Sequence, residues 1–219
     1  TYSLHFYIFK DRLGISDRID LIKNPEFILE SFIKVGKLKK INGLDFKSIK
    51  KIQSSLPKID PKYFLSPQAG QQFIEILKST TNLSTNLKKL KQLGILRLLI
   101  PEFGKIEGQM QFDMFHIYTV DEHTFKVVRN MRQMQIGKID ETLEIEHELI
   151  NKLPKIELLY LAGIFHDLGK GKGGDHSEIG EKIVNRFCKR LNFSAHDTEL
   201  ICWLVKNHLL MSSMSQKSD

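Results

Sequence analysis

A His-Asp doublet, His166-Asp167, is the feature of this sequence with the clearest chemical meaning. It ends an apolar segment, residues 156–165, and opens a glycine-rich stretch, residues 168–174, that carries two lysines. An unpaired carboxylate in an apolar setting is costly unless something binds it. A bound cation would remove that cost and could also activate a water molecule. The doublet therefore indicates hydrolytic metal chemistry.

One ion needs more ligands than the doublet offers, and the second half of the sequence supplies further candidates. The imidazoles and carboxylates that could share an ion are His123, His166, Asp167, His176, His208 and Asp219. A histidine alone is more often a hydrogen-bonded core or surface residue than a metal ligand. The presence of the doublet favours a ligand role for the other histidines in this set, because one ion needs further ligands. Mixed nitrogen and oxygen ligands suit small divalent ions and disfavour Ca. We expect a divalent metal cofactor, one of Mn, Mg, Fe, Co, Ni or Zn.

The elements that must position these ligands are helical almost throughout. Only residues 4–9 are predicted to form a strand, with Gly14 closing the turn after it. Asn24-Pro25-Glu26 and Ser66-Pro67 are typical helix starts, and apolar residues follow both at helical spacing. The fold class is therefore mainly α, with a short N-terminal strand.

Helix starts also surround the candidate ligands. Thr119 and Glu122 have the spacing of a capping box, which places His123 in the first turn of a helix. Asp175 or Ser177 can begin the helix after the glycine-rich stretch, and Ser194 begins the one that leads to His208. The ligands thus lie at helix ends and in loops.

A change of composition after Pro101 suggests two domains. Residues 103–110 resemble a connector, and seven of the eight histidines follow it. We place the boundary so that the domains are residues 1–105 and 106–219. Because the sequence opens with Thr1 rather than Met, we also expect a fragment of something longer.

The net charge of +7 does not by itself identify a partner. Most lysines lie between apolar positions at helical spacing, which is typical of solvated helix faces. They are not interleaved with aromatics, so nucleic acid is not favoured as a partner.

The apolar runs are too short for a membrane span, and no secretory signal is visible. Cys188 and Cys202 lack a paired motif, which indicates reduced core thiols in a cytoplasmic protein.

The ligand pattern resembles a known superfamily. The order His123, His166-Asp167 and Asp219 is similar to the H…HD…D signature of HD metal-dependent phosphohydrolases. More specifically, residues 108–124, 165–177 and 203–212 resemble the central portion of bacterial bifunctional uridylyltransferase/uridylyl-removing enzymes, which act on the PII nitrogen-signalling protein. Residues 99–104 are also similar to that family, so the resemblance covers most of the chain.

The resemblance implies an all-helical HD-type phosphohydrolase domain at residues 106–219, preceded by a helical linker region at residues 1–105. Full-length members would add a nucleotidyltransferase domain and glutamine-sensing ACT domains, and neither is evident in this sequence. Because Asp219 matches the last family ligand, we expect the HD domain to be truncated at its C-terminus. The chain should then be competent at most for the uridylyl-removing reaction, hydrolysis of a phosphodiester between UMP and a tyrosine of PII, with UMP as product.

The chemistry of this reaction leads to a hypothesis for the roles of individual residues. His123, His166, Asp167 and Asp219 would hold the principal ion. His176 and His208 would hold a second ion or contact phosphate oxygens. As further catalytic residues beside Asp167, Lys170 would neutralise charge on the phosphoryl group, and Asp175 would position the loop or act as a base, unless it is only a helix cap.

Two alternatives remain open from the sequence. The chain could be an HD phosphohydrolase that acts on a free nucleotide. It could instead be a non-catalytic, metal-stabilised helical module that docks a partner through the basic helices of its first half. An open ligand position for water at the metal would distinguish a catalytic site from a structural one.

Overall fold

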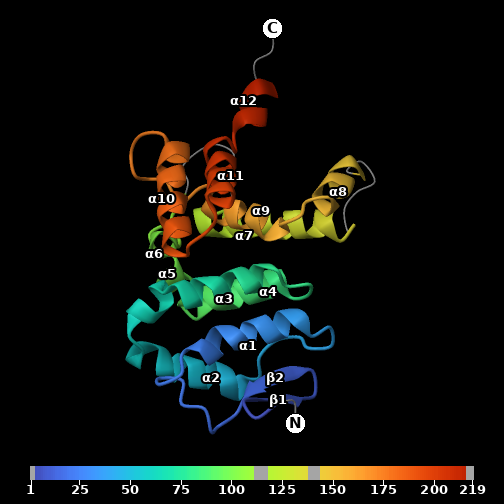
Figure 1. The fold of residues 1–219 in the computed structure, drawn as a ribbon, viewed down its shortest axis with the longest axis vertical. Coiled ribbons are helices and arrows are strands. Elements are labelled where there is room, and N and C mark those ends of the chain that lie inside the picture. Colours follow the sequence, from blue (N-terminus) through green and yellow to red (C-terminus); the bar gives the residue numbers. More distant parts are fainter. Residues whose placement is uncertain (1–2, 111–117, 138–143, 216–219) are drawn as a thin grey trace. The chain divides into compact units, whose positions relative to one another are not determined.

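The computed structural model describes residues 3–110, 118–137 and 144–215, and it divides the chain into two compact units, Thr1–Pro101 and Glu102–Asp219 (Figure 1). Helices dominate both units, and the one sheet among the described residues has two strands. The mainly α fold class is therefore confirmed. The domain boundary that we placed between residues 105 and 106 stays a prediction.

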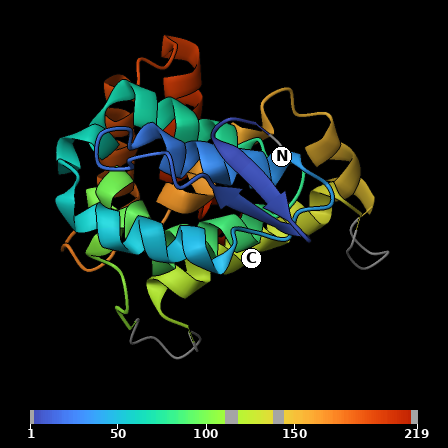
Figure 2. The same cartoon turned by 90° about the horizontal axis from the view of Figure 1, so that it is seen from below.

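The first unit begins with a β-hairpin rather than a single strand. Strand β1 (Phe6–Phe9) pairs antiparallel with β2 (Arg12–Ile15), as the two adjacent arrows in Figure 2 show. Lys10 lies in the turn between them, with a φ of 54°. The prediction that Gly14 closes the turn is wrong, because Gly14 lies within β2 opposite Tyr7. A Cβ there would lie 2.1 Å from the Tyr7 ring. The glycine is therefore required by cross-strand packing.

Helices form the rest of the first unit. They are α1 (Glu26–Lys37), α2 (Phe46–Ser55), α3 (Pro67–Leu77), α4 (Leu83–Gln92) and α5 (Ile95–Leu99), with 3₁₀ turns η1 (Leu56–Lys58) and η2 (Pro61–Leu65). The predicted start of α3 is confirmed, since the Ser66 hydroxyl accepts a hydrogen bond from Ala69 N at 3.2 Å. Helix α1 begins at Glu26, one residue later than predicted, because Pro25 occupies the N-cap position, and no side chain caps the helix. Buried Phe32, Phe64 and Phe73 belong to the core of this unit.

The second unit carries the candidate ligands on helices that pack around one central helix. Its elements are α6 (Pro101–Gly104, which begins at the boundary), α7 (Val120–Gln135), α8 (Glu144–Asn151), α9 (Ile156–Phe165), α10 (His176–Arg190), α11 (Ala195–Lys206) and α12 (Leu210–Ser215). Helix α9 contacts α7, α10 and α11. Its sequence is apolar on all sides, as expected for a buried helix.

None of the described helices combines the length and the apolar composition that a transmembrane span requires.

Candidate metal centre

The His-Asp doublet lies directly at the end of buried helix α9. His166 is the C-terminal cap of that helix, and Asp167 follows with a side chain that is only 2% exposed. Two glycines bring neighbouring segments close to the doublet. A Cβ on Gly169 would lie 2.1 Å from the carbonyl oxygen of His176, and a Cβ on Gly180 would lie 3.0 Å from the side chain of Val205. The doublet is thus buried where α9, α10 and α11 meet.

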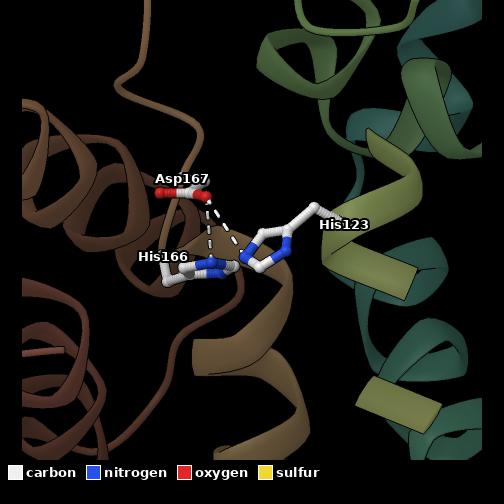
Figure 3. A group of neighbouring side chains, drawn as sticks. All are labelled: His123, His166 and Asp167. Carbon is white, nitrogen blue, oxygen red and sulfur yellow. Dashed lines mark ion pairs between the residues drawn. The ribbon is translucent and has the colours of Figure 1, made fainter. Parts of the chain in front are cut away.

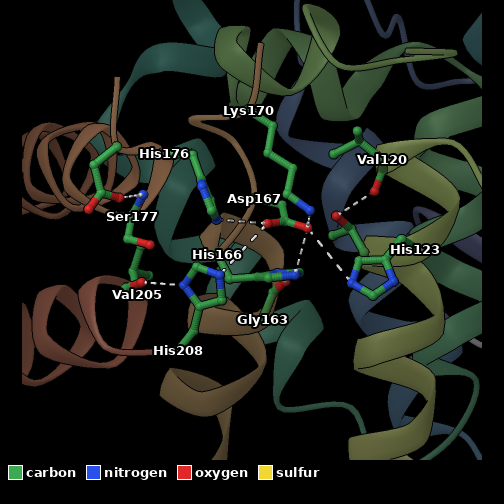
Figure 4. A network of polar contacts seen from close by, with 12 residues as sticks. Val120, His123, Gly163, His166, Asp167, Lys170, His176, Ser177, Val205 and His208 are labelled. Carbon is green, nitrogen blue, oxygen red and sulfur yellow. Dashed lines mark hydrogen bonds and ion pairs between the residues drawn. The ribbon is translucent and has the colours of Figure 1, made fainter. Parts of the chain in front are cut away.

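Four imidazoles converge on the Asp167 carboxylate (Figure 4). On one side, Nε2 of His166 lies 3.1 Å and Nε2 of His123 lies 3.7 Å from Oδ2 (Figure 3). On the other side, Nε2 of His176 and Nε2 of His208 each lie 3.8 Å from Oδ1. Each oxygen of one carboxylate therefore faces its own pair of imidazole nitrogens.

Backbone carbonyls decide how two of these imidazoles are protonated. Nδ1 of His166 lies 2.8 Å from the carbonyl oxygen of Gly163, and Nδ1 of His208 lies 2.7 Å from that of Val205. A carbonyl oxygen only accepts hydrogen bonds, so each Nδ1 must carry the proton. In the neutral tautomer, each Nε2 then directs a lone pair toward the Asp167 carboxylate. Only a proton or a metal cation between the two acceptors makes this arrangement favourable.

The third imidazole supports the same conclusion independently. The Nε2 atom of His176 is buried and has no hydrogen-bond partner among the residues that the structure describes. Burying an unsatisfied polar nitrogen costs free energy unless a ligand satisfies it. A cation between His176 and Asp167 would do so, and the donor set of this centre therefore fits a divalent ion.

The fourth imidazole is positioned by the start of α7. Buried Asp121 accepts a hydrogen bond from Gly108 N at 3.1 Å, and Val120 N donates to the carbonyl of Gln109 at 3.0 Å. Thr119 occupies the predicted N-cap position, but its side chain makes no capping hydrogen bond. The turn at Gly108 and Gln109, rather than a capping box, therefore anchors the first turn that carries His123.

Charges around the carboxylate keep it ionised. Burial alone would raise the pKa of Asp167, but the hydrogen bond and charge of His166, which it offers only when Nε2 is also protonated, and those of Lys170 lower it well below its usual range. Lys170 Nζ lies 2.8 Å from Oδ2 of Asp167. Burial also lowers the pKa of His208, which favours the neutral imidazole that metal binding requires.

The described residues contain two groups that could hold a metal ion. One consists of His123, His166 and Asp167, and the other of Asp167, His176 and His208. In each group the potential ligand atoms all lie within 4.8 Å of one another. Asp167 belongs to both, so its carboxylate could bridge two ions.

The remaining predicted site residues are placed differently. Asp175 is exposed and caps α10, with Oδ1 accepting a hydrogen bond from Ser177 N at 2.8 Å. Asp219, the predicted fourth ligand of the principal ion, lies outside the described residues.

Several groups that contribute to this centre were not predicted from the sequence. They are the carbonyls of Gly163 and Val205, the anchoring carboxylate of Asp121, and an apolar pocket beside the imidazoles. Each of the two carbonyls precedes its histidine by three residues at the end of a helix. That shared spacing is a signal that the sequence does contain. Nothing comparable in the sequence marks Asp121 or the pocket.

Comparisons with known proteins agree with this architecture. The family model for the uridylyltransferase GlnD third domain matches residues 6–98, and that for the HD domain matches residues 120–218. Similar proteins include the bifunctional uridylyltransferase/uridylyl-removing enzymes of Azotobacter vinelandii (strain DJ / ATCC BAA-1303), 43% identical over 90% of this chain, and of Nitrosospira multiformis (strain ATCC 25196 / NCIMB 11849 / C 71), 41% identical over 95%. The chain spans 22% and 24%, respectively, of the length of these relatives.

Proposed function

Because the chain belongs to the family of bifunctional uridylyltransferase/uridylyl-removing enzymes, we propose that it carries the uridylyl-removing activity. The reaction is hydrolysis of the phosphodiester between UMP and a tyrosine of the PII nitrogen-signalling protein, and it releases UMP. The observation that carries the proposal is the convergence of four imidazoles on Asp167.

The ligand roles follow from the geometry. His123 and His166 with Oδ2 of Asp167 would hold one ion, and His176 and His208 with Oδ1 would hold a second. Asp219 remains part of the proposal as a further ligand of the first ion. A divalent ion would polarise the phosphoryl group and lower the pKa of bound water to about 7.

The protein's own residues then perform three tasks. The carbonyls of Gly163 and Val205 hold two imidazoles in the tautomer that exposes Nε2. Lys170, whose ammonium group lies beside Asp167, would neutralise charge that develops on the phosphoryl oxygens. Asp175 would position the glycine-rich loop by capping α10. The leaving group is a phenolate with a pKa of about 10, so it requires little help from a general acid.

A direct test is UMP release from uridylylated PII in the presence of Mn²⁺. Asp167→Asn preserves the shape of the side chain and removes its charge, so we expect turnover to fall by at least about 1,000-fold while the helical circular dichroism is retained. His5→Ala is the matched control, because His5 is exposed, belongs to neither metal-binding group and lines neither the pocket nor the hollow beside the centre. Turnover that persists in Asp167→Asn would refute the metal-dependent proposal.

The relatives do not favour the two alternatives, hydrolysis of a free nucleotide and a non-catalytic docking module. A panel of free nucleotides in the same assay tests the first, because faster hydrolysis of a nucleotide than of uridylylated PII would reassign the substrate. The cytoplasmic location stays a prediction.

A further inference from the structure

We propose that the apolar pocket beside the metal centre binds the aryl ring on the leaving-group side of the phosphodiester. The nucleotide side of the substrate would then lie elsewhere. This inference rests on the proposed function and deepens it, because it assigns which half of the substrate the pocket selects.

The pocket is continuous with the metal centre. It has a volume of about 410 Å³, within the range of about 300–1,000 Å³ found for small-molecule sites. His123, His166 and His208 line it, and all three also belong to the metal-binding groups. The other lining residues are Val127, Met131, Leu159, Ala162, Gly163 and Leu204. A ring in this pocket would lie next to a phosphoryl group at the ions.

Helical spacing explains why the pocket has imidazoles at one end and aliphatic walls beyond them. On α7, Val127 and Met131 follow His123 by four and eight residues and lie on the same face. On α9, the spacing from Leu159 to His166 likewise places both on one face. Gly163 lets Met131 approach α9, since a Cβ there would lie 3.2 Å from the Met131 sulfur.

The chemistry of the lining favours an aryl ring over a uracil base. Uracil presents carbonyl oxygens and a ring N–H, which are costly to bury without hydrogen-bond partners. Apart from the imidazoles, the lining side chains are aliphatic, a thioether or a glycine. The imidazoles of His166 and His208 are already committed, with Nδ1 on a carbonyl and Nε2 facing Asp167. A phenyl ring needs no such partners, and thioethers and imidazoles pack well against it.

A second apolar hollow leaves room for the chain that carries the ring. It has a volume of about 320 Å³ and shares Leu159 and Leu204 with the pocket. Its other lining residues are Leu153, Pro154, Leu158 and Leu200, with the polar side chains of Lys155, His196 and Asp197. An aryl group attached to a polypeptide could therefore enter the pocket while the neighbouring residues of that polypeptide lie against the aliphatic and polar side chains of this hollow.

Calorimetric titration of the Mn²⁺-loaded protein with two phosphonates tests the inference without relying on turnover. Phenylphosphonate and methylphosphonate offer the same phosphoryl oxygens and differ in the ring. We expect phenylphosphonate to bind at least about tenfold more tightly, as burial of an aromatic ring predicts. Both should lose affinity when the metal is removed with EDTA.

Two variants on the same helix connect the preference to the pocket. Val127→Trp fills the pocket, so the preference for phenylphosphonate should fall below about twofold while methylphosphonate binding is retained. Asn130→Trp is the matched control, because Asn130 is exposed on α7 and does not line the pocket. Met131→Gln, nearly equal in size but polar, should weaken the preference as well, and it serves as the second variant if Val127→Trp does not fold.

The outcomes separate this inference from the proposed function. Equal, metal-dependent binding of both phosphonates would overturn the aryl pocket and leave the metal-dependent phosphohydrolase intact. Failure of both to bind the metal-loaded protein would overturn both proposals. If UMP binding, but not phenylphosphonate binding, is lost in Val127→Trp, the pocket holds the base and the inference is wrong.

Discussion

At the scale of single residues, the centre depends on where each imidazole carries its proton. Local backbone carbonyls hold Nδ1 of His166 and His208, and this leaves Nε2 of each directed at Asp167. The buried, unsatisfied Nε2 of His176 is directed at the same carboxylate. A bound cation would stabilise these residues most, because it would lie between their Nε2 atoms and the carboxylate. Their substitution should therefore affect metal binding most.

Single imidazole deletions should separate the two metal-binding groups. In His176→Ala we expect one of two Mn²⁺ sites to weaken by at least about 100-fold, because that group loses one of its three ligands. His123→Ala should weaken the other site to a similar extent. Calorimetric titration with Mn²⁺ would measure both, with His5→Ala as control. Two unchanged sites in His176→Ala would exclude that residue as a ligand.

The two cysteines should behave as buried thiols. Burial raises the pKa of Cys188 to about 12, and Cys202 is also buried with a raised pKa. The reactive thiolate is therefore scarce at pH 8. We expect less than about 10% of the thiols of the native protein to react with Ellman's reagent within minutes, and both to react in guanidinium chloride. Rapid labelling of the native protein would contradict the burial of Cys188.

At the scale of elements, glycines permit the close approaches that assemble the centre. Gly169 touches the backbone of His176 at the start of α10, and Gly180 lies against Val205 of α11. Backbone cannot move aside as a long side chain can, so the methyl group of an alanine at position 169 must displace the start of α10.

Gly169→Ala should therefore impair metal binding more than it impairs folding. We expect the site containing His176 to weaken by about tenfold or more and stability to fall by about 1–3 kcal/mol, as for other overpacked positions. Gly173→Ala is the control, because a Cβ there meets open space and the variant bears only the cost of a φ of +72°. Calorimetric titration and urea unfolding would measure the two effects. Equal metal affinity in both variants would argue against a displaced α10.

In the hairpin, Gly14→Ala should destabilise the first unit by about 1–3 kcal/mol, because its Cβ would collide with the Tyr7 ring. That ring also donates a hydrogen bond from its hydroxyl to Asp45, the cap of α2, so its displacement would disturb two elements. In a Tyr7→Leu background the same substitution should cost less than half as much. Urea unfolding of the four proteins forms a double-mutant cycle. A coupling energy of zero would rule out the predicted collision.

At the scale of the whole molecule, two compact units each bury their own apolar residues, and both metal-binding groups found among the described residues lie in the second. Trp203 is the single tryptophan of the sequence, and it lies on α11 in that second unit. Its fluorescence can therefore report how ligands affect the unit that contains the centre.

Metal binding should stabilise this unit against unfolding. At a free Mn²⁺ concentration 100 times the dissociation constant, we expect about 2.7 kcal/mol of stabilisation, measured as a higher urea midpoint for Trp203 fluorescence. EDTA should reverse the shift, and Asp167→Asn should show none. If the midpoint does not respond to Mn²⁺ in the unmodified protein, the ligands do not form a binding site.

Much of the candidate site could be predicted because its signals are local. The spacing of Ser66-Pro67 and the caps Asp175 and Ser194 specify helix starts, and the structure confirms each one. The His-Asp doublet at the end of an apolar helix identified the buried carboxylate. The prediction from local sequence was wrong in the hairpin. Gly14 is required there because the Tyr7 ring on the opposite strand leaves no room for a side chain, and not because of a turn.

The sequence alone determined the helical character of the chain, its candidate ligands and its family, since propensities, caps and motifs are properties of short segments. Tertiary structure decided which oxygen of Asp167 each histidine faces, how the Gly108 turn anchors α7, and that an apolar pocket opens beside the imidazoles. These features bring together residues up to 85 positions apart, from His123 to His208. They depend on how helices pack, which no local pattern encodes.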